Sequence, residues 1–149
     1  MADVDKNIKV SKNTLFYIAS VTKSFTAMAA LILESKKKLD FNKSLAEYFP
    51  EIDFAPELKA GYITIEHLIT HTHGLKNRPI GIATAYTGSF NKESLLKFLK
   101  HFTKVNNEAP FGEFEYTNLG YNILGMIIER EFGEDWKSIV KQELLDPLK

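Results

Sequence analysis

The chain has 149 residues, of which 44% are apolar and 26% are charged, a length and balance typical of one globular domain with its own core. Nineteen basic and nineteen acidic residues cancel, so no overall field attracts nucleic acid or an anionic membrane, and we expect neither as a partner. The absence of cysteine excludes thiol nucleophiles, cysteine-ligated zinc and disulfides. No linker-like composition divides the chain, so we expect a single domain over residues 1–149.

The N-terminal part has no continuous apolar run. Its first apolar stretch, residues 15–33, is interrupted by polar side chains between Ser20 and Thr26. We therefore expect neither a signal peptide nor a membrane span. The alternative is a weak signal sequence that ends near Ala29 and Ala30, and the compartment stays undecided.

A β-prone run at residues 15–18 is followed by a helical pattern from Ser20 to the three lysines at 36–38. Apolar side chains lie all around this helix, which predicts that it is buried in a larger structure. Most of the later predicted helices have a capping residue before the first apolar position, and most have a Gly or Pro after the last. They are a short turn within residues 40–50 closed by Pro50, 65–70 between Thr64 and Gly74, 92–102 after Asn91, 119–132 between Asn118 and Gly133, and 136–145 between Asp135 and Pro147. The expected fold is mainly α, with almost no sheet.

A Ser-x-x-Lys motif at Ser20 and Lys23 is the first candidate for chemistry, because residues three apart on a helix share a face. Five of the eight serines have lysine three positions later, so spacing alone has little weight. Context separates them, since Lys23 is the only charged residue between Asn13 and Leu33. Burial would favour a neutral Lys23 amine that takes the Ser20 proton. The alternative is that Lys23 extends to water and Ser20 only caps the helix.

A second candidate element is Tyr116-Thr117-Asn118, on a turn before an apolar helix. A tyrosine beside a lysine can form a phenolate and act as a general base, and an asparagine amide can hold a substrate carbonyl. The alternative reading makes Tyr116 a packed aromatic and Asn118 a helix cap.

Four stretches of the sequence resemble the serine β-lactamase and penicillin-binding-protein superfamily, in the branch of class C β-lactamases, D-alanyl-D-alanine carboxypeptidases and related esterases. In order along the chain, they are residues 15–26, 38–50, 65–75 and 114–121. The resemblance implies the helical region of the β-lactamase/transpeptidase-like α+β fold, with most of the sheet missing. By position it implies Ser20 as the acylated nucleophile, Lys23 as its proton partner, Tyr116 as general base and Asn118 as a substrate-orienting amide.

Two departures from the family pattern affect these expectations. The family usually has serine where this chain has His73, which we interpret as a variation behind the reacting groups. The third family motif, Lys-Thr-Gly or His-x-Gly on a strand that donates one oxyanion-hole amide, has no counterpart in the chain. We therefore expect a poor catalyst, and apolar surface at residues 15–18 and on the Ser20 helix that promotes self-association.

The histidines raise the possibility of a metal site. His67 and His71 are four residues apart on one predicted helix, and His73 is close. Glu66 is the one carboxylate nearby, and similar turns in the family are structural, so we expect no metal.

The sequence therefore predicts a β-lactamase-like serine hydrolase that transfers an acyl group from a β-lactam, peptide or ester carbonyl to Ser20 and then to water. No cofactor is expected, and the partner is a small-molecule or peptide acyl substrate. The alternatives are a non-catalytic helical scaffold that keeps the motifs, and a carboxylic-ester hydrolase. The family is often periplasmic or secreted, but the chain itself leaves its localisation unknown.

Overall fold

A computed structural model describes residues 1–76, 78, 80–81 and 92–148. The described part is mainly helical, as expected, and contains no strand; its extended segments meet only at isolated bridges. The helices are α1 (Thr22–Ser35), α2 (Leu45–Tyr48), α3 (Ile65–Ile69), α5 (Lys92–Phe102), α6 (Leu119–Phe132) and α7 (Trp136–Val140). None of these described helices is long and apolar enough to cross a membrane.

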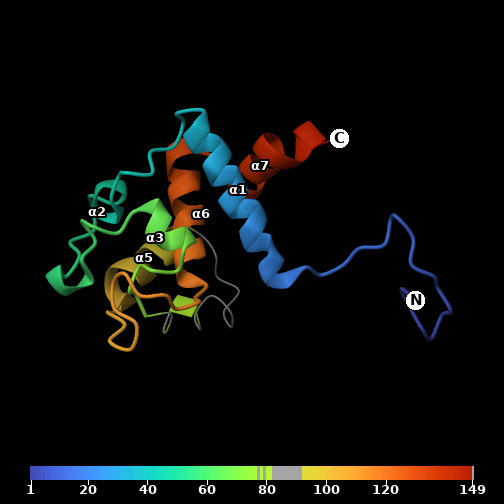
Figure 1. Ribbon diagram of the computed structural model, residues 1–149, viewed down its shortest axis with the longest axis horizontal. Helices are drawn as coiled ribbons and strands as arrows, with labels where there is room; N and C mark the ends of the chain where they lie inside the picture. Colours follow the sequence, from blue (N-terminus) through green and yellow to red (C-terminus); the bar gives the residue numbers. More distant parts are fainter. Residues whose placement is uncertain (77, 79, 82–91, 149) are drawn as a thin grey trace.

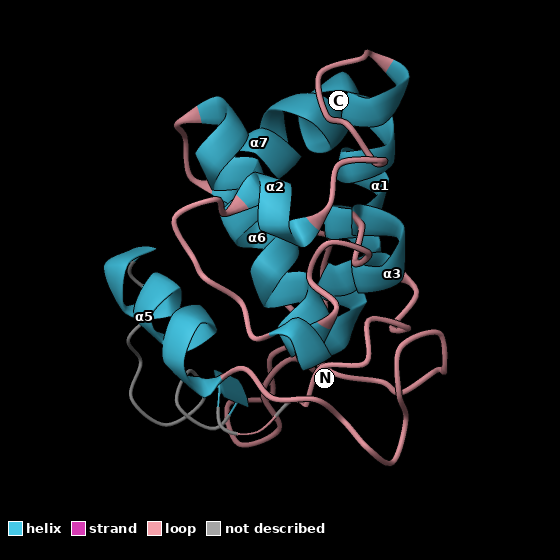
Figure 2. Ribbon diagram, turned by 90° about the vertical axis from the view of Figure 1, so that its left-hand side faces the viewer, coloured by secondary structure: helices cyan, strands magenta, loops and turns pink. Residues whose placement is uncertain are grey.

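Helix α6 is the centre of the bundle. It packs against α1, α3 and α7, and in Figure 1 α1 lies on one side of it and α2, α3 and α5 on the other. Figure 2, seen from the side of α2, shows α2 in front of α6 and α5 at one edge of the bundle. Most of its apolar residues are buried, and Gly120 lets α3 approach, because a Cβ there would lie 2.7 Å from the Leu68 carbonyl oxygen. The site described below lies at the N-terminal ends of α1 and α6.

Only one face of α1 is buried, and apolar side chains on its other face are exposed, as expected for the Ser20 helix in this chain. Ala29, Ala30 and Leu33 are inaccessible to solvent, whereas Met28 and Leu31 are 49% and 46% exposed. Among the described elements, α6, α7 and the turn that follows α7 pack on α1. They cover a single side of the helix.

The β-prone run at residues 15–18 forms no strand with the described part of the chain. These residues are exposed, and the N-terminal segment extends away from the helices (Figure 1). A strand needs a neighbouring backbone to satisfy its amide groups. In the described part of the chain no such neighbour lies beside this segment.

Most helix bounds match the sequence expectation. The predicted turn before Pro50 is α2, and the bounds of α5 and α6 are those expected, with Gly133 at a φ of 69° after α6. Asp135 caps α7, accepting a hydrogen bond from the Lys137 amide at 2.8 Å. The proposed cap Asn91 lies outside the described residues.

Two helix ends differ from the prediction. α3 stops at Ile69 and the chain reverses at His71, which has a φ of 61°, rather than at Gly74. The last helix changes its hydrogen-bond pattern after Val140, continuing as a π-helical turn, Lys141–Leu145, and a 3-10 turn, Asp146–Leu148, that contains Pro147.

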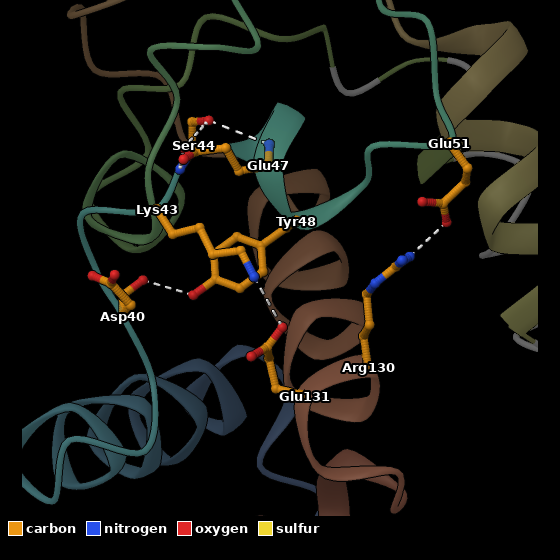
Figure 3. A network of polar contacts seen from close by, with 8 residues as sticks. All are labelled: Asp40, Lys43, Ser44, Glu47, Tyr48, Glu51, Arg130 and Glu131. Carbon is orange, nitrogen blue, oxygen red and sulfur yellow. Dashed lines mark hydrogen bonds and ion pairs between the residues drawn. The ribbon is translucent and has the colours of Figure 1, made fainter.

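A polar network ties the α2 region to the C-terminal half of α6 (Figure 3). The buried Tyr48 hydroxyl donates to the Asp40 carbonyl oxygen at 2.6 Å, and Lys43 lies over the Tyr48 ring while its Nζ is 3.3 Å from Glu131. Arg130 pairs with Glu51 at 2.5 Å. These contacts fasten the α2 region to α6. They lie at the end of α6 opposite the site described below.

Candidate active site

Ser20 lies in a strained turn at the start of α1. It is the central residue of the 3-10 turn Ala19–Val21, and Ala19 has a φ of 46°, a left-handed conformation that costs a non-glycine residue about 1 kcal/mol. Ser20 is exposed, and α1 has no side-chain cap bond. The capping alternative for Ser20 is therefore not what the structure shows.

Lys23 lies one helical turn after Ser20, and three side-chain oxygen atoms surround its amino group. Its Nζ lies 3.3 Å from Ser20 Oγ, 2.8 Å from Tyr116 Oη and 2.7 Å from Asn118 Oδ1. An ammonium group has three N–H donors, so these distances suit a protonated lysine that donates to all three. The structure thus brings together the four side chains that the sequence singled out.

Tyr116 comes from a loop more than ninety residues away in the chain. Its side chain is not packed in a core, since the residue is 52% exposed. The hydrogen bond from Lys23, and then that from Ser20, lowers the pKa of the Tyr116 phenol below its usual value. An ammonium on one side and a serine hydroxyl on the other are what a phenolate base would need.

Asn118 stands at the boundary of α6. It is the residue before the helix, but its side chain makes no capping hydrogen bond to the helix backbone. Its Oδ1 accepts from Lys23 instead. The amide is therefore turned toward the same point as Ser20 and Tyr116.

The other Ser-x-x-Lys pairs have a different environment. In each described case the lysine pairs with a carboxylate: Lys38 with Glu143, Lys97 with Glu93, and Lys141 with Asp146. Ser89, of the remaining pair, lies outside the described residues. Lys23 differs from these lysines in contacting hydroxyl, phenol and amide oxygens.

A cavity of about 530 Å³ opens beside Ser20 and runs along α6. Its walls include Lys23 and Asn118 near Ser20, and Glu129, Trp136 and Lys137 at the far end. Sequence reasoning missed Tyr121, which also lines the cavity and whose ring lies 5.7 Å from Lys23 Nζ. Its spacing of three residues from Asn118 on a helix was the available signal.

The histidines do not share a helix face, which corrects the prediction for His67 and His71. α3 ends at Ile69, so His71 lies beyond the helix. His67 Nδ1 is hydrogen-bonded to the Thr64 hydroxyl at 2.9 Å. His73 is buried at 2% exposure. Among the described residues, no three His, Asp or Glu side chains are close enough to hold a metal ion together.

Comparisons with known proteins identify the family of the chain. The sequence profile of the family described as Beta-lactamase matches residues 1–149. Protein flp of Staphylococcus aureus is 31% identical over 148 residues, and penicillin-binding protein 4* of Bacillus subtilis is 28% identical over 160 residues. Each alignment covers 98% of this chain, but the chain spans only 29% and 32% of those relatives.

A solved structure with a closely similar fold is the D-amino acid amidase of Ochrobactrum anthropi SV3, complexed with D-phenylalanine. It superimposes with a TM-score of 0.76 and 27% identity, over 99% of this chain and 39% of the amidase. The described helices therefore correspond to the helical portion of that larger fold.

Proposed function

This chain belongs to the Beta-lactamase family, and from that premise we propose that it carries the nucleophile and general base of a serine hydrolase. Ser20 is the nucleophile, Tyr116 the base, Lys23 the cation that stabilises the phenolate, and Asn118 an amide that orients the substrate. The observation that supports these roles is the contact of Lys23 Nζ with Ser20, Tyr116 and Asn118.

In the acylation step, the Tyr116 phenolate takes the hydroxyl proton of Ser20 as Ser20 Oγ bonds to the substrate carbonyl carbon. The bond to the leaving amine or alcohol then breaks, and the phenol returns the proton to that group. In deacylation, Tyr116 takes a proton from water, the hydroxide attacks the acyl carbon, and Ser20 leaves with the proton. Lys23 keeps its charge throughout, which differs from the neutral amine first expected.

The substrate class that we propose is an acyl compound with an amide or β-lactam carbonyl. The support is the relatives: one is named a penicillin-binding protein, and another is an amidase that was solved with D-phenylalanine. The cavity extends well beyond Ser20, which gives room for the acyl portion of such a compound.

Covalent labelling tests the proposal without requiring turnover. The protein is exposed to benzylpenicillin or to a fluorophosphonate, and the modified residue is found by intact mass and peptide mapping. We expect one adduct, on Ser20, that Ser20→Ala abolishes. The matched control is Ser94→Ala, which removes a Ser-x-x-Lys serine whose lysine pairs with Glu93.

The two reagents also separate the alternatives. Labelling by the fluorophosphonate and by nitrophenyl esters, but by no penicillin, would point to an ester hydrolase. Labelling at another serine, or no Ser20 adduct with any reagent, would overturn the assignment and favour a non-catalytic scaffold.

A further inference from the structure

Thr117 is buried and hydrogen-bonded from two directions, whereas the residues on either side of it are exposed. The residue is 3% exposed, whereas Tyr116 on one side and Asn118 on the other are exposed. Its backbone N–H donates to His71 Nδ1 at 3.3 Å, and its Oγ1 lies 3.1 Å from His73 Nε2. The two histidines therefore contact the middle residue of the Tyr116-Thr117-Asn118 turn.

His71 also holds the residue before Tyr116. Its carbonyl oxygen accepts the Glu115 amide at 3.0 Å, and its ring centroid is 4.8 Å from that of Tyr116. Both peptide neighbours of Tyr116 are thus bonded to one residue. His71 can make these contacts because its φ of 61° turns its carbonyl and its ring toward the same loop.

The hydrogen bonds define which form of each ring is present. His71 Nδ1 accepts from Thr117, and His73 Nδ1 accepts the Leu75 amide at 3.0 Å. A ring nitrogen that accepts carries no proton, so each imidazole is neutral with its proton on Nε2. In His73 that proton is then donated to the Thr117 hydroxyl.

The surroundings favour the neutral form. The titratable groups that face His71 are Lys23 of α1, Tyr121 of α6, Tyr116 and His73, and His67 in turn acts on His73. Burial, and then the Lys23 charge, lower the pKa of His71, while burial lowers the pKa of His73 to about 4. The Glu115 carboxylate is bound to Asn106 rather than to either ring.

We propose that His71 and His73 clamp Thr117 and so position Tyr116 and Asn118 against Lys23, and that this holds only while both imidazoles are neutral. The inference rests on the proposed function in that Tyr116 is the base. His71 is a positioning residue, and protonation of its Nδ1 would remove the acceptor for the Thr117 amide. The geometry of the base would then be lost as the pH falls through the lowered pKa of His71.

Two substitutions at His71 isolate the acceptor. Asn and Gly both tolerate a positive φ, but only Asn keeps an oxygen where Nδ1 stood. The first readout is the Tyr116 phenol pKa, followed by NMR of 13Cζ-labelled tyrosine and assigned with Tyr116→Phe. We expect a lowered pKa in the wild type and in His71→Asn, and a rise toward about 10 in His71→Gly. The control His101→Asn should change nothing.

The second readout is the rate of Ser20 acylation by benzylpenicillin as a function of pH. We expect the acid limb caused by His71 to disappear in His71→Asn, and His71→Gly to be slower at every pH by about ten- to a hundredfold. A tyrosine pKa that responds as expected in a protein that no reagent acylates would reject the proposed function and keep the clamp. An unchanged Tyr116 pKa in His71→Gly would overturn the clamp.

A measurement on the unmodified protein keeps the proposal testable even where His71→Gly does not fold. Long-range 1H–15N spectra report which ring nitrogen carries the proton. We expect His71 and His73 both to be protonated on Nε2 at neutral pH. A proton on His71 Nδ1 would overturn the clamp, because that nitrogen could not accept from Thr117.

Discussion

At the scale of single residues, the candidate site is defined by one cation shared among three oxygen atoms. Lys23 is one of five lysines with serine three positions before it, but its partners are a hydroxyl, a phenol and an amide. None of these oxygen atoms carries a fixed charge. The ammonium group therefore stabilises the anionic form of any of them that can lose a proton. Tyr116 is the one whose ordinary pKa, about 10, lies lowest, and contact with Lys23 lowers the pKa of Tyr116 further.

The first prediction concerns the pH dependence of Ser20 acylation. Because the pKa of Tyr116 is lowered, the base form is present above that pKa, and the rate should rise with pH to a midpoint below 10, the usual value for tyrosine. Lys23→Met should move the midpoint upward and slow acylation at pH 8 by about a hundredfold. Acylation reactions quenched at a series of times and analysed by mass spectrometry measure the midpoint of the pH dependence and the rate at pH 8. Lys97→Met is the control, and a midpoint unchanged in Lys23→Met would contradict the role of Lys23.

The second prediction concerns acid stability and His73. The folded protein disfavours protonation of this histidine, whose pKa falls from 6.5 to about 4. Below pH 6.5 the unfolded chain binds a proton at this histidine that the folded chain does not bind. The contribution of His73 to the free energy of unfolding is therefore fully present above pH 6.5 and is lost as the pH falls toward 4. The decline amounts to about 3 kcal/mol.

Urea unfolding at a series of pH values measures this effect. His73→Ser introduces the residue that the family usually has and should flatten the dependence between pH 6.5 and 4, although it lowers stability at neutral pH. His101→Ser, which changes an exposed histidine, should keep the wild-type dependence. Parallel curves for the wild type and His73→Ser would show that His73 is not the group responsible.

At the scale of elements, the site depends on how closely α6 approaches α3. Gly120 is in the first turn of α6, where a Cβ would lie 2.7 Å from the Leu68 carbonyl oxygen and 3.0 Å from the His73 ring. Gly125 is on the same helix, but a Cβ there would be 3.5 Å from Trp136, an ordinary contact distance. Replacement by alanine is therefore expected to destabilise the protein at Gly120 but not at Gly125.

The third prediction compares these glycines. Gly120→Ala should destabilise the protein by about 1–3 kcal/mol, because backbone and a buried ring must shift. It should also slow Ser20 acylation, since Thr117 and Asn118 precede this turn. Gly125→Ala should be neutral or stabilising by up to about 1 kcal/mol through helix propensity. Urea unfolding of both variants measures the change in the free energy of unfolding. Equal destabilisation by the two substitutions would contradict the close approach of α6 to α3.

At the scale of the whole molecule, the described residues form a helical bundle with uncovered apolar side chains in the N-terminal segment and on α1. Leu15 and Tyr17 are 96% and 97% exposed, and Met28 and Leu31 on α1 are 49% and 46% exposed. In the amidase, whose fold is similar, this chain corresponds to 39% of the length.

The fourth prediction is that the 149-residue chain turns over its substrates slowly. Two backbone amides normally stabilise the oxyanion in this family, and the described residues contain no strand to supply the second. Loss of one donor typically slows acyl transfer by about a hundredfold or more. Hydrolysis of a chromogenic cephalosporin or a nitrophenyl ester measures the rate. A rate typical of an enzyme that Ser20→Ala abolishes would refute this expectation.

The fifth prediction is concentration-dependent self-association through the exposed N-terminal segment and α1. Leu15→Ser combined with Tyr17→Ser should shift the sedimentation-velocity distribution toward monomer, because less apolar surface is buried between copies. Tyr62→Ser is the control, since Tyr62 is 71% exposed in a different part of the molecule. Monomer at all concentrations in the unmodified chain would disprove the idea.

The amino-acid sequence by itself determined the mainly α fold class and most helix positions. α5 and α6 have the predicted bounds because apolar periodicity and local signals such as Asp135 and Gly133 act within a few residues. The family resemblance likewise indicated Ser20, Lys23, Tyr116 and Asn118 before any geometry was known.

Only the tertiary structure decided what those residues do to one another. It turned Asn118 toward Lys23 rather than toward its own helix, and it left residues 15–18 without the neighbouring strand that their composition favours. It also placed His71 beyond the end of α3, so that His71 reaches Thr117 together with His73 instead of sharing a helix face with His67. The contacts of Asn118, His71 and His73 join segments far apart in the chain, and they satisfy polar groups that the local sequence leaves unpaired. Residues 15–18, in contrast, pair with none of the described segments.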